Sequence, residues 1–294
     1  MANTINPVIK YLPQVVDKVN KEASFITDLM MDAQGIKSDL SNSSEVKVRK
    51  YTFGGLGKYD GSITANAGMT ATWETKSLAN KRSTKLLLET IEGLEGQVEL
   101  STMVAEFQRT QVVPERDAYV LAKGYTNAAN KATPATLSAS TVKAAIDLGI
   151  KTLNEAEAPK IGRLLYVSCE VFDYMKNASN FSYTLNAGEG QNALDTRVAS
   201  YEGMKVIEIP KSRFNTEVTL SDTNGFTLTG QDINFLIVCP SALAVIDKVT
   251  KGEIVPSSAN PDSFEDVYKY LTYYDAITFD NQAVNLYGHA KAAA

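Results

Sequence analysis

The chain has 294 residues and carries 29 Lys+Arg against 34 Asp+Glu, which gives a formal net charge of −5 at pH 7. Hydrophobic residues make up 44% and charged residues 21%, values that exclude a collagen-like, coiled-coil or disordered chain. The mild acidity argues against a general nucleic-acid-binding protein, because such domains usually have a pI above about 9.

Residues 1–45 read as a separate arm. Apolar residues recur there at helical spacing, but Pro7 and Pro13 interrupt the pattern. The segment is too short and too broken to build its own core. We therefore expect an apolar arm that is buried against another surface.

Residues 46–90 predict one long, two-stranded excursion. A strand at 46–53 alternates basic residues with valines, and further β-type runs lie near 73–77 and 83–88. Two strands alone are marginally stable in water, so this excursion needs a surface to lie on.

The charges of the excursion are unusual. From Val46 to Glu89, eight basic and three acidic residues give 8 − 3 = +5, whereas residues 252–280 carry six acids and a single lysine. The basic excursion and the acidic segment at 252–280 suggest that copies of the chain bind each other through opposite charges. The alternative is that both faces are solvated and have no partner. The inter-subunit contact candidates are Arg49, Lys50, Lys58, Lys81, Arg82, Glu265 and Asp266.

The rest of the chain reads as helices and strands in an α+β order. We predict a long helix over 97–131 that Pro114 interrupts. A compact α/β unit should follow over about 133–260, and the tail should return to strands. The elements predicted in these two regions are a helix at 140–157, a strand at 163–168, a helix at 170–176, strands at 204–210 and 233–238, an apolar helix at 242–246, and tail strands at 268–274 and 276–287.

No motif predicts an active site. The glycine run at 54–57 follows a strand, but Asp60 stands where a dinucleotide fingerprint needs its third glycine, and no P-loop occurs. His289 is the only histidine and reads as a strand-end or tail residue, which removes most metal sites and hydrolase triads. Cys169 and Cys239 read as buried free thiols. The sequence therefore predicts no enzyme, no cofactor and no metal.

Several short segments of the chain resemble the sequences of a known family. Residues 112–119 read VVPERDAY, residues 163–168 read RLLYVS and residues 201–210 read YEGMKVIEIP. Further phrases are VFDYM at 171–175, YYDA at 273–276 and NLYGH at 285–289. The sequences of these segments and their order along the chain resemble the HK97-fold major capsid proteins of tailed bacteriophages, especially those of phages of Gram-positive hosts.

This resemblance implies an α+β, HK97-like capsid fold over nearly the whole chain. It implies an N-terminal arm (1–45), a long β-hairpin extended loop (46–95), a spine helix with the first part of the peripheral domain (96–132), an α/β axial domain (133–260), and C-terminal strands of the peripheral domain (261–294).

The resemblance also implies a structural viral protein. Copies would self-assemble in the host cytoplasm into hexamers and pentamers of an icosahedral virion shell. The shell would enclose double-stranded DNA without sequence-specific binding and would have no membrane. The expected partners are a portal and a scaffold, either a separate protein or a removed extension. Some family members crosslink an extended-loop lysine to a neighbour's asparagine, and Lys58 is the matching candidate.

Three other functions stay open at this point. An encapsulin-like compartment shell would have the same fold but hold cargo protein. A small α/β enzyme with a β-arm would be a compact monomer whose melting temperature a ligand raises. A tubular tail protein is the third, although the helices and the α/β unit argue against it.

Overall fold

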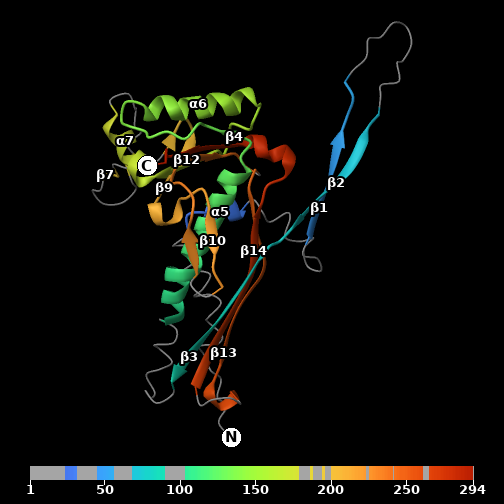
Figure 1. The fold of residues 1–294 in the computed structure, drawn as a ribbon, viewed down its shortest axis with the longest axis vertical. Helices are drawn as coiled ribbons and strands as arrows, with labels where there is room; N and C mark the ends of the chain where they lie inside the picture. Colours follow the sequence, from blue (N-terminus) through green and yellow to red (C-terminus); the bar gives the residue numbers. More distant parts are fainter. Residues whose placement is uncertain are drawn as a thin grey trace.

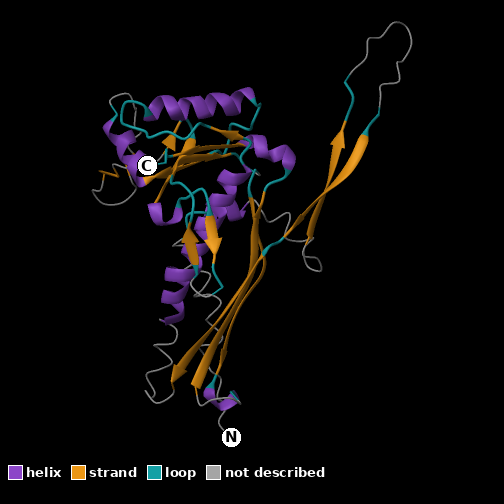
Figure 2. Cartoon of the chain, in the orientation of Figure 1, coloured by secondary structure: helices purple, strands orange, loops and turns teal. Residues whose placement is uncertain are grey.

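The computed structural model of this chain describes residues 24–31, 45–55, 68–89, 103–178, 186–187, 194–195, 200–222, 225–240, 242–260 and 265–293. Figures 1 and 2 show an elongated molecule. A body of helices and short strands forms one end, a long sheet extends from it, and a hairpin projects to one side. The arrangement is the mixed α+β organisation that the sequence predicted.

The body is built on a mixed sheet. Among the described residues this sheet has six strands in the order β4-β15-β12-β5-β9-β8. Strand β12 runs antiparallel to β15 and β5, whereas β5 and β9 are parallel. The bounds are β4 Asn130–Lys131, β5 Leu164–Ser168, β8 Ser200–Tyr201, β9 Met204–Ile209, β12 Ile233–Val238 and β15 Leu286–Ala290.

Helices cover both faces of this sheet. In β5, Leu165 and Val167 point into one apolar cluster, with α6 (Val142–Glu155) and α7 (Cys169–Asn177), while Tyr166 points into the other, with α5 (Val113–Asn127). All six residues of β12 are buried. A strand that is covered on both sides needs a continuous apolar run, which explains the sequence INFLIV.

Two glycines let the helices approach the sheet closely. A Cβ at Gly149 of α6 would lie 2.9 Å from the ring of Tyr287, and a Cβ at Gly288 would lie 2.6 Å from the ring of Tyr125. Such distances are too short for carbon atoms in contact. The two aromatic rings therefore fill the space that the missing side chains leave, one on each side of β15.

The long helix passes Pro114 without ending. Residues 103–107 are α-helical, η3 (Gln108–Val112) is a π-helical turn, and α5 follows directly. The Val113 N–H donates to the Gln108 carbonyl, five residues earlier. Pro114 sits in the first turn of α5, where its missing N–H costs little. The predicted interruption is therefore a wider turn within one continuous rod.

A second sheet extends away from the body. Within the described residues it has three antiparallel strands in the order β13-β14-β3, with bounds Ala244–Val255, Glu265–Ile277 and Asn80–Glu89. The predicted helix at 242–246 is wrong, because Ala244 pairs with Ile277 and Ile246 with Asp275 in β13. The run at 83–88 also lies here, in β3, and does not pair with the first strand of the excursion.

The remaining elements are short. A separate hairpin joins β1 (Glu45–Thr52) to β2 (Thr70–Ser77), and a small one joins β10 to β11. The other bounds are α2 Thr27–Met31, β6 Asn186–Ala187, β7 Leu194–Asp195, η4 Lys211–Arg213, β10 Val218–Leu220, β11 Phe226–Leu228, η5 Ser257–Ala259 and η6 Asp280–Asn285. Within the part of the chain described here, no helix has the length and apolar character needed to cross a membrane.

The two cysteines differ in exposure. Cys239 is buried, as predicted, whereas Cys169 is exposed and the prediction of a buried thiol is wrong there. Cys169 is the first residue of α7, directly after the Ser168 cap, so its side chain lies at the edge of the body rather than under it.

We expect the stability of the fold to depend on pH through His289. It is buried in β15 against the ring of Phe235, its Nδ1 accepts a hydrogen bond from Asn234 at 3.0 Å, and burial lowers its pKa. The folded state therefore disfavours the proton that the unfolded chain takes up near pH 6.5. We expect the unfolding free energy to fall as the pH drops below that value, and His289→Gln to reduce this loss. Urea denaturation at neutral pH and at about pH 5 measures it; an unchanged pH dependence in the variant would contradict this assignment.

Candidate inter-subunit surfaces

The β1–β2 hairpin has two faces of different character. Antiparallel partners such as Arg49 and Trp73, or Val48 and Glu74, point to the same side, and successive residues alternate. One face carries the even-numbered residues and turns toward the body. The other, which we call the outer hairpin face, carries Arg49, Tyr51, Phe53, Met69 and Trp73.

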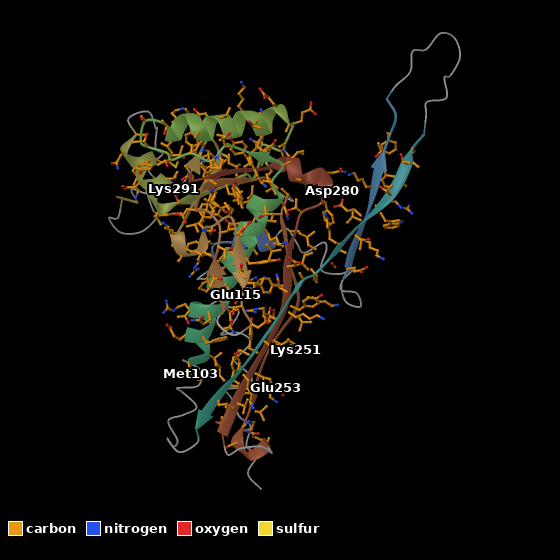
Figure 3. The ribbon with its side chains drawn as sticks, viewed as in Figure 1. Met103, Glu115, Lys251, Glu253, Asp280 and Lys291 are labelled. Atoms are coloured by element: carbon orange, nitrogen blue, oxygen red, sulfur yellow. The ribbon has the colours of Figure 1, made fainter. Side chains whose placement is uncertain are left out.

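The body-facing side is fixed to η6 and to the long sheet. Lys76 and Lys50 lie 3.2 and 3.9 Å from the carboxylate of Asp280, and the Asp280 N–H donates to Glu74 at 3.0 Å (Figure 3). Val46 is buried in an apolar cluster with Ile246. The hydrogen bond to Glu74 and the neighbouring Asp280 raise the pKa of Lys76, and Lys76 lowers the pKa of Asp280. These contacts fix the base of the hairpin.

Removing the Asp280 charge should loosen the hairpin without unfolding the body. The pKa of Asp280 is lower in the folded chain than in the unfolded chain, so its ionised carboxylate stabilises the fold at pH values above the unfolded pKa. This stabilisation is lost as the pH falls through the folded pKa. We expect Asp280→Asn to speed hydrogen exchange in residues 45–77 by about fivefold, with little change elsewhere. Asp173→Asn, at an exposed position of α7, is the matched control. Equal exchange rates in the two variants would rule out this anchoring role.

The outer hairpin face exposes large apolar side chains. Phe53 is 70% exposed, Met69 63% and Trp73 62%. The Arg49 guanidinium lies 4.7 Å from the centre of the Trp73 ring, and Tyr51 stacks on Phe53 with ring centres 6.2 Å apart. A contiguous exposed patch of aromatic and arginine side chains is typical of a protein–protein interface.

The two basic candidates of β3 are used within their own chain. Lys81 lies 5.1 Å above the ring of Tyr273. Arg82 forms a two-pronged ion pair with Glu115 at 2.8 and 2.9 Å, and it also donates to the carbonyls of Ser221 and Gly225. The sequence suggested a contact to a neighbour for Arg82; the structure gives it another role, joining β3, α5 and the β10–β11 turn.

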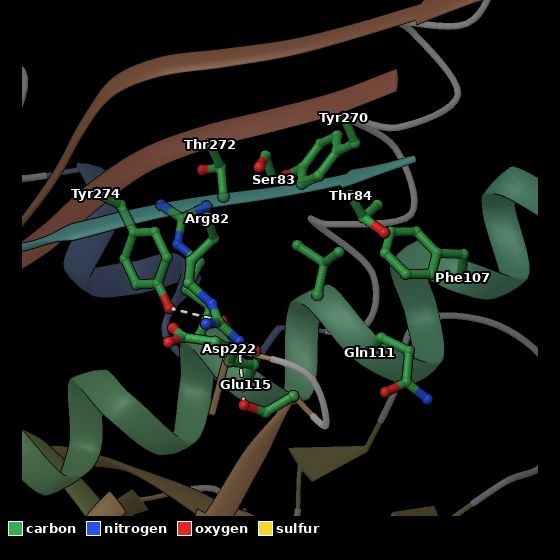
Figure 4. Close-up of a pocket in the computed structure, with 13 residues that line it drawn as sticks. Arg82, Ser83, Thr84, Phe107, Gln111, Glu115, Asp222, Tyr270, Thr272 and Tyr274 are labelled. Carbon is green, nitrogen blue, oxygen red and sulfur yellow. Dashed lines mark hydrogen bonds and ion pairs between the residues drawn. The ribbon is translucent and has the colours of Figure 1, made fainter. Parts of the chain in front are cut away.

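This ion pair lines a cavity of about 400 Å³ between the long sheet and the long helix (Figure 4). Phe107, Tyr270 and Tyr274 contribute aromatic walls. Burial raises the pKa of Tyr270 to about 12 and that of Tyr274 further, so neither ring is a ready proton donor or acceptor at neutral pH. Among the charged groups of the cavity, Arg82 pairs with Glu115 and Arg116 pairs with Asp247. No described residues form a cluster of three or more potential metal ligands.

Three carboxylates of the predicted acidic surface have partners within their own chain. Asp275 is buried and accepts hydrogen bonds from the Ala79 N–H and the Tyr119 hydroxyl. Asp280 pairs with Lys76, and Asp266 accepts from the Ser257 N–H at 2.6 Å. These three carboxylates are therefore engaged within the chain, whereas Glu253 is exposed. Lys58 and the Glu265 side chain lie outside the described part of the structure.

Residues 24–31 of the arm pack on their own chain. Ile26 and Leu29 are buried in the cluster between α5 and the six-stranded sheet. The buried carboxylate of Asp117 accepts hydrogen bonds from the Ser24 hydroxyl at 2.7 Å and the Phe25 N–H at 3.0 Å, and it pairs with Arg213 at 3.1 Å. Burial raises the pKa of Asp117 despite these donors. The surface that buries this part of the arm is therefore the body of its own chain.

Comparison with known structures places this arrangement in one fold. The chain matches a structure from Mycobacterium phage Che8 with a TM-score of 0.62 and 16% identity, over 87% of both chains. It matches the mature capsid of bacteriophage PhiM1 with a TM-score of 0.63 and 13% identity, over 85% of this chain and 82% of the other. The chain has the HK97-like capsid fold.

This fold is also that of a virus-like particle from Pyrococcus furiosus, which the chain matches with a TM-score of 0.54 and 10% identity over 95% of its length and 98% of the other. No protein-family model and no curated protein matches the sequence. The HK97-like fold that the sequence phrases predicted is therefore confirmed by structure, at identities too low for a sequence search to detect.

Proposed function

We propose that this chain is the major subunit of a phage-type capsid. Copies would assemble into hexamers and pentamers of an icosahedral shell that encloses double-stranded DNA. The observation that carries the proposal is the match to a mature phage capsid over more than four-fifths of both chains.

The outer hairpin face supports the same proposal. Its aromatic side chains are exposed in the single chain, and burying them between copies would remove apolar surface from water. A contact between unlike surfaces that closes by rotation generates rings, as a shell requires. Among the predicted contact residues, Arg49 lies on this face, whereas Lys50 faces Asp280 and Arg82 faces Glu115. We therefore propose Arg49 as the basic residue that contacts a neighbour, with Lys81, Glu265 and Asp266 as further candidates.

The finer parts of the proposal concern domains and partners. We propose the arm at 1–45, the extended loop at 46–95, the peripheral domain at 96–132 with 261–294, and the axial domain at 133–260. Two strands cross these bounds, since β13 pairs with β14 in the long sheet and β15 pairs with β12 in the body. A scaffold and a portal would be the protein partners, and the enclosed DNA would be held without sequence readout. Lys58 would be the crosslinking lysine of the loop; a denaturing gel of mature particles that shows only monomer would contradict that role.

Electron microscopy of the purified protein tests the proposal. We expect closed icosahedral particles, formed by the chain alone or with its scaffold, in which nuclease-protected double-stranded DNA accompanies the mature form. A preparation that stays monomeric under every assembly condition, or that forms only open tubes, would contradict it.

A second candidate is a protein compartment with the same shell. The near-complete overlap with the Pyrococcus furiosus virus-like particle favours it. Such particles would hold a cargo protein and no protected DNA. Mass spectrometry and nuclease digestion of the particle contents separate the two functions.

A further inference from the structure

The cavity between the long sheet and the long helix has the shape and walls of a site for an aromatic ring. Phe107, Tyr270 and Tyr274 line it (Figure 4), and Phe107 meets Tyr270 edge to face with ring centres 6.3 Å apart. Its volume of about 400 Å³ lies in the range of about 300–1,000 Å³ that is usual for pockets that hold small molecules. Gln111 and Val112 of the π-helical turn η3 form part of the wall, and such turns are frequent at functional sites. The cavity is therefore large enough to receive one aromatic side chain.

The rim of the cavity carries an excess of negative charge. Arg82 pairs with Glu115, and Arg116 pairs with Asp247 of β13. Asp222 lies exposed in the turn between β10 and β11 and takes part in none of the ion pairs between described residues. Glu115 is the main cause of the raised pKa of Arg82, and Asp222 is a minor one. Two guanidinium groups thus stand against three carboxylates, so the net charge of these five groups is 2 − 3 = −1.

The outer hairpin face presents the complementary side chains. Trp73 is 62% exposed, and the Arg49 guanidinium lies 4.7 Å from the centre of its ring, so an aromatic ring and a positive charge stand together. Within the described part of the chain, the side-chain hydrogen bond, the stacked rings and the cation–π contacts of this face all lie within the face itself. The base of the hairpin is fixed to Asp280, and the hairpin projects away from α5 (Figure 1). A cavity that receives Trp73 therefore belongs to another copy.

We propose that Trp73 of one copy enters this cavity in a second copy and that Arg49 lies beside Asp222 at its rim. The indole packs against the rings of Phe107 and Tyr270, and the polar rim supplies an acceptor for its N–H. The inference rests on the proposed capsid function, because it names the surface that buries the outer hairpin face. The hairpin and the cavity are different surfaces, so the contact is head-to-tail, and contacts of this kind generate rings when the rotation closes.

A charge exchange between the two surfaces tests the contact in the full-length chain. Arg49→Glu and Asp222→Arg should each raise the protein concentration needed for assembly by about tenfold, because each variant places like charges together. The two changes combined restore opposite charges, so this concentration should return to within about threefold of the parent value. Asp173→Arg, at an exposed position of α7, is the matched control and should restore nothing when combined with Arg49→Glu. Light scattering measures assembly, and circular dichroism checks that each variant is folded.

Filling the cavity tests the same contact without a change of charge. Thr84 of β3 lines the cavity and lies directly opposite Tyr270 in the sheet. Thr84→Phe places a ring in the space that the indole needs, so we expect the assembly concentration to rise by about tenfold or more. Thr84→Val keeps the size of the side chain and should assemble like the parent chain.

The results separate this inference from the capsid proposal. If Asp222→Arg restores the assembly of Arg49→Glu no better than Asp173→Arg does, the inference is wrong, while closed particles of the parent chain leave the capsid proposal intact. Assembly of a folded Thr84→Phe chain at the parent concentration would overturn the inference in the same way. A parent chain that forms no closed particles under any assembly condition contradicts the capsid proposal itself, and this contact with it.

Discussion

Replacing Asp117 with alanine should lower the free energy of unfolding by about 3–5 kcal/mol, because it removes the buried carboxylate that pairs with the Arg213 guanidinium at 3.1 Å. The same change removes the acceptor of the Ser24 hydroxyl and the Phe25 N–H. Urea denaturation followed by circular dichroism measures the loss, and hydrogen exchange in residues 24–31 should become faster.

Ser24→Ala serves as the control for the arm alone. It removes one hydrogen bond to Asp117 and leaves Arg213 paired, so we expect a loss of about 1 kcal/mol. If Asp117→Ala lowers the free energy of unfolding no more than Ser24→Ala does, Asp117 does not link the arm to α5 and Arg213.

Truncating the outer hairpin face should block assembly and leave the subunit folded. Trp73 is 62% exposed in the single chain, so Trp73→Ala removes little intramolecular packing. A large aromatic side chain at the centre of an interface contributes about 2 kcal/mol or more to binding. We therefore expect the protein concentration needed for assembly to rise by about thirtyfold, since each 1.4 kcal/mol changes an affinity about tenfold. Light scattering during assembly measures that concentration.

Two control variants separate assembly from folding. Ile161 is 90% exposed in the turn between α6 and β5, so Ile161→Ser removes an exposed apolar side chain away from the hairpin. It should assemble like the parent chain. Arg82→Ala should lower the unfolding free energy, because Glu115 loses its partner. A Trp73→Ala chain that assembles at the parent concentration would contradict the role of this face.

Most of the body could be predicted from local sequence pattern. The helix at 142–155 shows an apolar stripe at helical spacing, and β12 is a six-residue apolar run of the kind that a doubly covered strand requires. The segment at 242–246 could not be assigned in this way. A short apolar run fits a helix or a strand equally well, and its partner Ile277 lies more than 30 residues along the chain.

Counting charges by segment does not reveal the ion pairs that form in the folded chain. Lys76 and Asp280 are 204 positions apart, and Arg82 and Glu115 are 33 apart, yet each pair is in contact. Charges that appear unpaired along the sequence are thus neutralised within the folded chain.

We propose that the outer hairpin face is exposed in a single chain and becomes buried between chains on assembly. Trp73 is the single tryptophan of the sequence, so its fluorescence reports on this face alone. Acrylamide quenching should therefore be strong in the dilute subunit and weak in closed particles, with emission moving to shorter wavelength on assembly. Closed particles in which Trp73 stays as accessible to acrylamide as in the dilute subunit would contradict the account.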